Sequence, residues 1–165
     1  LSRSEEDGRG ILSSHLHSEG KHAKELALEG PSTSRWVPEI IAENNPDDES
    51  YYPYMNGQFV FKHAVVRFSE AIIEGLEANG LQKEDINMLI PHQANLRIAQ
   101  FIQRKFQLND DQVYNNIMNY GNTTAASVII ALTEAWEKGK INEGDLVVLA
   151  AFGSGFTWGS VVVRW

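Results

Sequence analysis

The sequence predicts an α/β fold, in which strands and helices alternate along the chain. Residues 87–90 form a short apolar run that polar residues precede and Pro91 ends, as in a buried strand. Between residues 96 and 106 the apolar side chains recur at helical spacing. Residues 145–152 and 156–165 are further apolar segments, each long enough for a buried strand. We therefore expect a sheet packed by helices.

Residues 11–18 predict the first strand. Alternation gives it two faces, one with Leu12, Ser14 and Leu16 and the other with Ile11, Ser13, His15 and His17. Residues two apart on a strand share a face, so His15, His17 and His22 could be read as zinc ligands. No carboxylate or fourth histidine lies at a recognised spacing, and we expect polar strand residues and no metal.

Residues 20–54 are the least regular part of the chain. They contain a Gly-Pro-Ser-Thr-Ser stretch at 30–34 and an acidic, asparagine-rich stretch at 44–49, which are typical of loops. Because this length exceeds that of an ordinary connection, we expect a variable surface excursion over residues 31–54.

A long helix is predicted from Met55-Asn56-Gly57 onward. Asn79-Gly80 ends it with residues suited to a left-handed cap. Its apolar stripe consists of Phe61, Val65, Phe68, Ile72 and Leu76.

His92 lies where the strand of residues 87–90 gives way to the helix of residues 96–106. In open α/β sheets, ligands bind at the carboxyl ends of strands. A helix N-terminus disfavours a cation, so we expect His92 to be a neutral imidazole that can donate a hydrogen bond.

The next elements are a short strand at 113–118, a tight turn at 119–127 and a helix to about Lys138. Small residues in the first turns of that helix suit close packing on a sheet, and Gly139 ends it.

Two strand-end turns therefore carry a hydrogen-bonding side chain, His92 and Asn122, and the turn Gly153-Ser154-Gly155 offers main-chain amides. Imidazole, carboxamide and main-chain N–H groups are all donors, and donors that converge on one oxygen form an oxyanion hole. The alternative for each residue is structural, a capped helix and a turn asparagine. Gly-Ser-Gly entering a strand does not fit the nucleophile elbow of hydrolases, and Gly139-Lys140 does not fit a phosphate loop.

Composition excludes several classes of function. The 165 residues fit one domain, and 14 basic against 22 acidic residues give a net charge of −8. Phosphate binding needs a basic footprint, so we expect no nucleic-acid partner. The chain has no cysteine, no apolar run of membrane-spanning length and no signal peptide. We therefore expect a cytoplasmic protein without membrane contact. Because the chain begins with Leu1 and not with an initiator methionine, we also expect it to be part of a larger protein.

Three motifs stand out in the chain: Ile90-Pro91-His92-Gln93-Ala94-Asn95, Tyr120-Gly121-Asn122-Thr123-Thr124-Ala125-Ala126-Ser127 and Phe152-Gly153-Ser154-Gly155-Phe156-Thr157-Trp158-Gly159. In this order and spacing they resemble the C-terminal half of β-ketoacyl-acyl carrier protein synthase III. The likeness extends from about Gly8 to Trp165, where residues 8–17 resemble the first strand of that half.

The resemblance implies a thiolase-like fold, an αβαβα sandwich of two similar halves with a mixed sheet packed by helices, and a homodimer. It implies condensation of an acyl-CoA, typically acetyl-CoA, with malonyl-acyl carrier protein, and no cofactor. In this family a cysteine takes the acyl group. His92 and Asn122 match the histidine and asparagine that hold the malonyl thioester, and Ser154 matches the main-chain oxyanion position.

The same match implies further binding residues. Asn95 falls in the pantetheine-binding region, and Phe61 and Lys62 match residues near the active-site tunnel. Arg97, Arg104 and Lys105 would face an acidic carrier protein. The alternative for these three is an exposed basic helix face, and for Phe61 and Lys62 ordinary packing and solvation.

The absence of cysteine departs from the family, whose nucleophile belongs to the N-terminal half. We therefore expect residues 1–165 to be the C-terminal domain of a synthase and to be inactive alone. A related synthase of secondary metabolism and a non-catalytic carrier-binding domain remain alternatives.

Overall fold

The structure, a computed structural model, describes residues 8–30 and 49–165. Within them a four-stranded sheet has the order β1-β6-β5-β4. Strands β4 and β5 are parallel, whereas β6 runs antiparallel to both β5 and β1. The sheet is therefore mixed, as predicted. Its strands are β1 (Gly10–Ser18), β4 (Met88–Pro91), β5 (Leu146–Gly153) and β6 (Thr157–Arg164).

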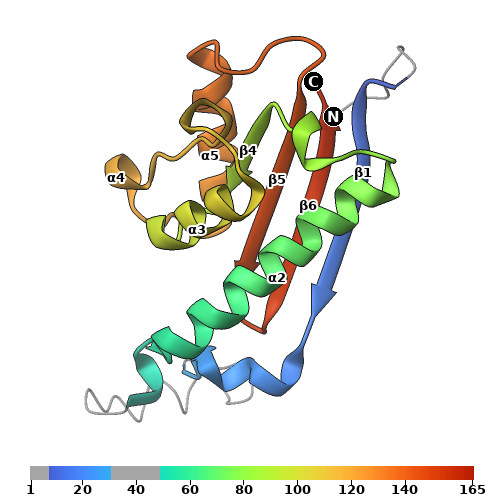
Figure 1. Ribbon diagram of the computed structural model, residues 1–165. Helices are drawn as coiled ribbons and strands as arrows, with labels where there is room; N and C mark the ends of the chain where they lie inside the picture. The colour runs from blue at the N-terminus through green and yellow to red at the C-terminus, as the bar shows by residue number, and fades with distance from the viewer. Residues whose placement is uncertain (1–7, 31–48) are drawn as a thin grey trace.

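Helices pack on both faces of this sheet (Figure 1). Helix α2 (Gly57–Ala78) contacts β1, β5 and β6, and helix α5 (Ala126–Glu137) contacts β4 and β5. Alternate residues of β5 point to opposite faces of the sheet. Val148 packs in the hydrophobic cluster under α2, and Val147 packs in the cluster under α5. The other helices are α3 (Leu96–Phe106), α4 (Ile117–Tyr120) and the 3₁₀ turns η1 (Gly20–Glu25), η2 (Glu49–Tyr51), η3 (Lys83–Asp85) and η4 (Asp110–Gln112).

The predicted limits of α2 are confirmed. The Asn56 side chain accepts a hydrogen bond from the Phe59 N–H at 3.3 Å and caps the helix. At the other end Gly80 has a φ of 65°. In between, Gly75 lets α2 approach β6, since a Cβ there would lie 2.9 Å from Cγ2 of Val162.

The face assignment of the first strand needs one correction. The register of β1 against β6 shifts between Ile11 and Ser13, so a bulge places Leu12 on the same side as Ser13. Leu12 packs against the α2 core, whereas Leu16 is 80% exposed. The predicted alternation holds from Ser13 onward.

The prediction of irregular structure over residues 20–54 is wrong at both ends of that segment. Strand β2 (Leu26–Ala27) pairs with β3 (Tyr54–Met55), and the Gly30 N–H donates to the Ser50 carbonyl at 2.6 Å. A short antiparallel pair thus joins residues 26–27 to residues 54–55. Residues 31–48 of the predicted excursion lie outside the described residues.

The strand predicted at 113–118 is also wrong. Val113 makes a single bridge to Leu89, and α4 begins at Ile117. The final helix agrees with the prediction, because the small residues Ser127, Ala131 and Ala135 are its buried ones.

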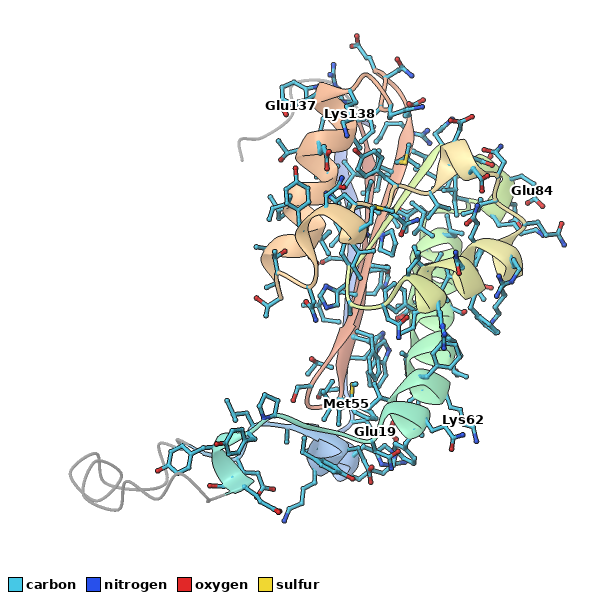
Figure 2. All side chains as sticks on the ribbon, turned by 90° about the vertical axis from the view of Figure 1, so that its left-hand side faces the viewer. Glu19, Met55, Lys62, Glu84, Glu137 and Lys138 are labelled. Atoms are coloured by element: carbon cyan, nitrogen blue, oxygen red, sulfur yellow. The ribbon has the colours of Figure 1, made fainter. Side chains whose placement is uncertain are left out.

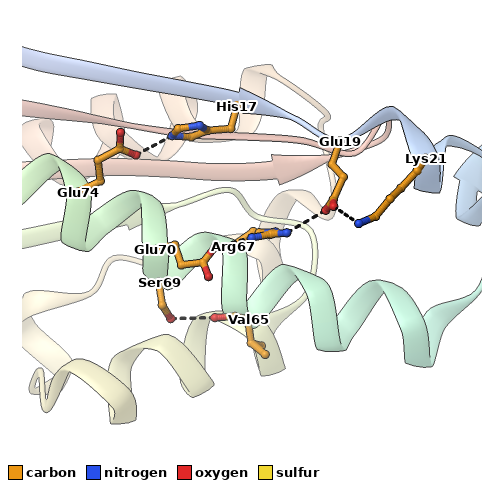
Figure 3. A network of polar contacts seen from close by, with 8 residues as sticks. All are labelled: His17, Glu19, Lys21, Val65, Arg67, Ser69, Glu70 and Glu74. Atoms are coloured by element: carbon orange, nitrogen blue, oxygen red, sulfur yellow. Dashed lines mark hydrogen bonds and ion pairs between the residues drawn. The ribbon is translucent and has the colours of Figure 1, made fainter.

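Two histidines of β1 contact Glu74 of α2. His17 Nε2 lies 2.6 Å and His15 Nδ1 3.3 Å from the Glu74 carboxylate. Nearby, Glu19 bonds Arg67 and Lys21 (Figure 3). No group of three or more possible metal ligands occurs within residues 8–30 and 49–165. In the same residues, no helix has both the length and the apolar character of a membrane span.

Candidate active site

His92 follows β4 directly, at the carboxyl end of the parallel strand pair. Its N–H donates to the Ala150 carbonyl of β5 at 2.8 Å, so the ladder extends one residue beyond Pro91. The prediction that His92 sits on the helix N-terminus is wrong. Helix α3 begins at Leu96 and is capped by Asn95, whose Oδ1 accepts from the Arg97 N–H at 2.9 Å.

The His92 imidazole is half-buried, and Nδ1 lies 2.5 Å from Oγ of Ser127 on α5. Burial lowers the pKa of His92, because desolvation disfavours the charged ring. The expected neutral imidazole is therefore favoured, although burial rather than a helix dipole is the cause. With Nδ1 occupied, Nε2 has no hydrogen-bond partner in the part of the chain that the structure describes.

Gln93 anchors the turn that carries His92. Its side chain is 2% exposed and bonds main-chain groups on both sides. Nε2 donates to the Pro91 carbonyl at 2.7 Å, and Oε1 accepts from the N–H groups of Asn116 and Ile117 at 2.9 and 3.1 Å. By accepting these two hydrogen bonds, the Gln93 carboxamide holds the first turn of α4 in place. Residues 113–118 therefore do not form the predicted strand.

Asn122 lies in the loop between α4 and α5. Its Oδ1 accepts a hydrogen bond from the Thr124 N–H at 2.9 Å, and the positive φ values of Gly121 (66°) and Thr124 (53°) shape the loop. The carboxamide orientation is thus fixed by its oxygen. Among the described residues Nδ2 has no partner, so it remains available as a donor.

Ser127 links the turn that carries His92 to the segment that follows Asn122. It lies five residues after Asn122 in the first turn of α5, is 2% exposed and contacts His92. His92 and the segment that follows Asn122 are therefore adjacent. His92 is held through Nδ1 and Asn122 through Oδ1, whereas Nε2 of His92 and Nδ2 of Asn122 have no partner within the described ranges.

The turn that contains Ser154 lies beyond β5 at the same edge of the sheet. Since Ala150 is level with Pro91, Ser154 lies four residues farther along the strand direction, roughly 13 Å. Ser154 Oγ donates to the Leu26 carbonyl at 2.5 Å, and Thr157 Oγ1 donates to the Ser154 carbonyl at 2.9 Å. The Ser154 N–H makes no hydrogen bond to any residue that the structure describes.

Comparison with known proteins identifies the fold and the family. A family model described as 3-oxoacyl-acyl-carrier-protein synthase III, C terminal, matches residues 76–165, more than half of the chain. The chain belongs to the 3-oxoacyl-acyl-carrier-protein synthase III family. The β-ketoacyl-acyl-carrier-protein synthase III of Rhodospirillum centenum is 46% identical over 158 residues, which are 95% of this chain and 45% of that protein.

Solved structures of the synthase III family agree. The 3-oxoacyl-acyl-carrier-protein synthase III of Aquifex aeolicus superposes with a TM-score of 0.84 and 36% identity, over 99% of this chain and 47% of that one. A priming β-ketosynthase of a polyketide biosynthetic pathway has a TM-score of 0.78 and 26% identity, over 96% and 46% of the two chains. These findings confirm the thiolase-like fold. The chain spans about half the length of the curated relatives it matches.

The other site residues predicted for a synthase III lie on α2, on α3 and at the N-cap of α3. Phe61 is half-buried and packs edge-on against Phe101 of α3, with ring centroids 6.4 Å apart. Lys62 is exposed at the N-terminal end of α2, far from Lys138 (Figure 2). Asn95 is the cap of α3 described above. The roles of these residues in substrate binding stay predictions.

The three basic residues of α3 are exposed and occupy positions i, i+7 and i+8, which lie within about 100° around the helix. Arg97 and Arg104 are two turns apart and lie on the same side of the helix. Lys105 follows Arg104 directly and lies about 100° farther around the helix. It borders a pocket of about 220 Å³ between the C-terminal ends of α2 and α3. The role of Arg97, Arg104 and Lys105 in carrier-protein docking stays a prediction.

Sequence reasoning missed Ser127 and Gln93 as supports of the synthase site. Both residues occur in the quoted motifs, but His92 as the partner of Ser127, and Asn116 and Ile117 as partners of Gln93, lie 23 to 35 residues away from them. A buried glutamine beside a histidine was the available signal, since a buried carboxamide has to satisfy its donors and acceptors.

Proposed function

We propose that this chain forms the C-terminal half of a synthase that condenses an acyl-CoA with malonyl-acyl carrier protein. In this proposal His92 and Asn122 hold the malonyl thioester oxygen, and the product is a 3-oxoacyl-acyl carrier protein. The observation that carries the proposal is the contact between His92 and Ser127, which brings the segment that follows Asn122 against His92. His92 is held through Nδ1 and Asn122 through Oδ1, which leaves Nε2 and Nδ2 to face a substrate.

Two such donors suit decarboxylation. The bond between the carboxylate carbon and the methylene carbon of the malonyl group breaks, and CO₂ leaves. The electron pair remains as an enolate, whose charge resides on the thioester oxygen. Preorganised donors stabilise charge that develops in the transition state, and removing one costs about 100- to 1,000-fold in rate. A neutral His92 can donate throughout, because burial lowers its pKa.

The enolate carbon then forms a bond to the acyl carbon held on a cysteine, and the thiolate leaves. Residues 1–165 contain no cysteine, so the proposal assigns the thiol to residues outside them. The tetrahedral intermediate on the acyl carbon carries its own oxyanion. The N–H of Ser154, which has no partner among the described residues, is the donor proposed for it.

Partners and location follow the same proposal. The printed names of the relatives include acyl carrier protein, and CoA thioesters would be the primers. A homodimer in the cytoplasm, without membrane or nucleic-acid contact, completes the proposal. Phe61 and Lys62 would border the pantetheine tunnel and Asn95 would contact pantetheine.

The test separates the two half-reactions in the complete synthase. His92→Ala should slow malonyl-carrier decarboxylation about 100- to 1,000-fold, because one oxyanion donor is lost. Transfer of the acetyl group from acetyl-CoA to the cysteine should remain largely intact, since His92 has no part in that step. Equal loss of both half-reactions would indicate a structural role for His92 and contradict the proposal. The 165 residues alone should show no turnover.

A synthase of secondary metabolism is the second candidate function. It is favoured by the superposition on a priming β-ketosynthase of a polyketide pathway. That enzyme class would use the same two donors with a different primer, so a panel of acyl-CoA substrates on the complete synthase distinguishes the two candidates.

A further inference from the structure

Ser127 carries a buried hydroxyl that contacts the proposed donor His92. Its Oγ lies 2.5 Å from Nδ1 of His92 and 3.2 Å from the main-chain nitrogen of Gln93. We propose that the Ser127 hydroxyl donates its hydrogen to Nδ1 and fixes His92 as the tautomer with its proton on Nε2. The inference rests on the proposed function, in which His92 acts as a donor, and it assigns Ser127 as a positioning residue.

The direction of this hydrogen bond follows from the hydrogens that must be satisfied. A serine hydroxyl has one hydrogen to donate and two lone pairs. The Gln93 N–H can only donate, so it uses one lone pair of Oγ. If the hydroxyl hydrogen goes to Nδ1, every hydrogen at this junction has an acceptor.

The opposite arrangement leaves a hydrogen without a partner. If Nδ1–H donated to Oγ, the hydroxyl would have to direct its own hydrogen elsewhere. Across residues 8–30 and 49–165, Ser127 Oγ has no bonding partner besides His92 and Gln93. Ser127 is only 2% exposed, and an unsatisfied buried donor costs about 1–3 kcal/mol. The first arrangement is therefore the stable one.

The tautomer decides what His92 offers to a thioester oxygen. A neutral imidazole carries one N–H and one lone pair, on opposite sides of the ring. With the proton on Nε2, the free side of His92 presents a donor. With the proton on Nδ1, it would present a lone pair to the enolate oxygen, which repels the developing charge. Ser127 therefore acts on the decarboxylation step and not on acylation of the cysteine.

Three serine variants of the complete synthase test this role. Ser127→Ala should slow decarboxylation about 10- to 100-fold with little change in KM, because supporting groups of this kind act through orientation and tautomer. Ser127→Thr, which keeps a hydroxyl, should recover most of the rate. Ser69→Ala is the matched control, since Ser69 is an equally buried helix serine whose Oγ donates to the Val65 carbonyl at 2.7 Å (Figure 3).

The tautomer of His92 can also be observed directly by NMR. In synthase labelled with ¹⁵N-histidine, the His92 signals are assigned by their loss in His92→Gln, and the shifts of its two ring nitrogens show which is protonated. We expect the proton on Nε2 in the unsubstituted enzyme and a shift of population toward Nδ1–H in Ser127→Ala. A proton on Nδ1 in the unsubstituted enzyme would overturn the inference.

The outcomes separate this inference from the proposed function. If His92→Ala abolishes decarboxylation while Ser127→Ala behaves like Ser69→Ala, the role of Ser127 is refuted and the function stands. If His92→Ala leaves decarboxylation intact, the proposed function itself fails.

Discussion

The carboxamide oxygen of Gln93 accepts a hydrogen bond from the main-chain N–H of Asn116 at 2.9 Å. The residue next to the proposed donor His92 is thereby joined to the start of the helix that leads to Asn122. One side chain thus sets the spacing between two segments that lie about 30 residues apart. This connection explains how two turns without secondary structure of their own can hold a precise site.

Replacement of Gln93 by alanine should destabilise the chain by about 2–4 kcal/mol. The main-chain N–H groups of Asn116 and Ile117 would lose their acceptor, and an unsatisfied buried donor costs about 1–3 kcal/mol. Urea unfolding measures the effect. Gln103→Ala is the matched control, because Gln103 makes a solvent-exposed hydrogen bond to Asp110 and should change stability by less than about 0.5 kcal/mol. Equal effects of the two replacements would refute the anchoring role.

The acidic limit of stability should depend on Glu19. Hydrogen bonds from Lys21 and then Arg67 lower the pKa of Glu19 from 4.5 to about 2 (Figure 3). A carboxylate whose folded pKa is depressed stabilises the fold fully above its unfolded pKa. That contribution is lost as the pH falls from 4.5 towards 2. The free energy of unfolding should therefore decrease less steeply over this range in Glu19→Gln than in the unsubstituted chain.

Glu137→Gln is the control for that experiment. It removes the same charge, but Glu137 is exposed and forms no ion pair with any described residue. Its pH profile should follow that of the unsubstituted chain. If Glu19→Gln also follows it between pH 4.5 and 2, the Glu19 ion pairs contribute nothing measurable.

Carrier-protein docking should depend on Arg97 and Arg104. The packing of Phe61 on Phe101 brings α2 beside α3. Charge reversal of both arginines in the complete synthase should raise KM for malonyl-carrier protein about tenfold, more at low than at high salt. Decarboxylation of malonyl-CoA should be unchanged, because CoA carries no docking protein.

Lys24→Glu provides the comparison for that charge reversal. Its side chain is 90% exposed on η1, away from α3. An equal rise in KM in Lys24→Glu would mean that net charge alone, and not a docking face, controls the interaction.

The parts of the fold that local chemistry determines could be predicted from sequence. Asn56 and Gly80 limit α2 because capping depends on a few neighbouring residues. The bulge at Leu12 could not be predicted, since it arises from pairing with β6, about 150 residues away. Residues 113–118 have a strand-like pattern, yet the Gln93 side chain turns them into the start of a helix.

The candidate site was predictable to a similar extent. The position of His92 after a buried strand follows from the apolar run and Pro91. Its neutrality was expected for a different reason, because burial depends on contacts that the sequence does not show. Ser127, 35 residues farther along the chain, could be recognised as its partner only once α5 was placed beside β4.

The central claim is that His92 and Asn122 hold the same thioester oxygen. A crystal structure of the complete synthase with a malonyl thioester analogue that cannot decarboxylate tests it most directly. We predict that the thioester oxygen lies about 2.7–3.1 Å from both Nε2 of His92 and Nδ2 of Asn122, the range of a working oxyanion hole. An analogue whose oxygen contacts neither atom, or only one while the other side chain faces a separate cavity, would contradict the account.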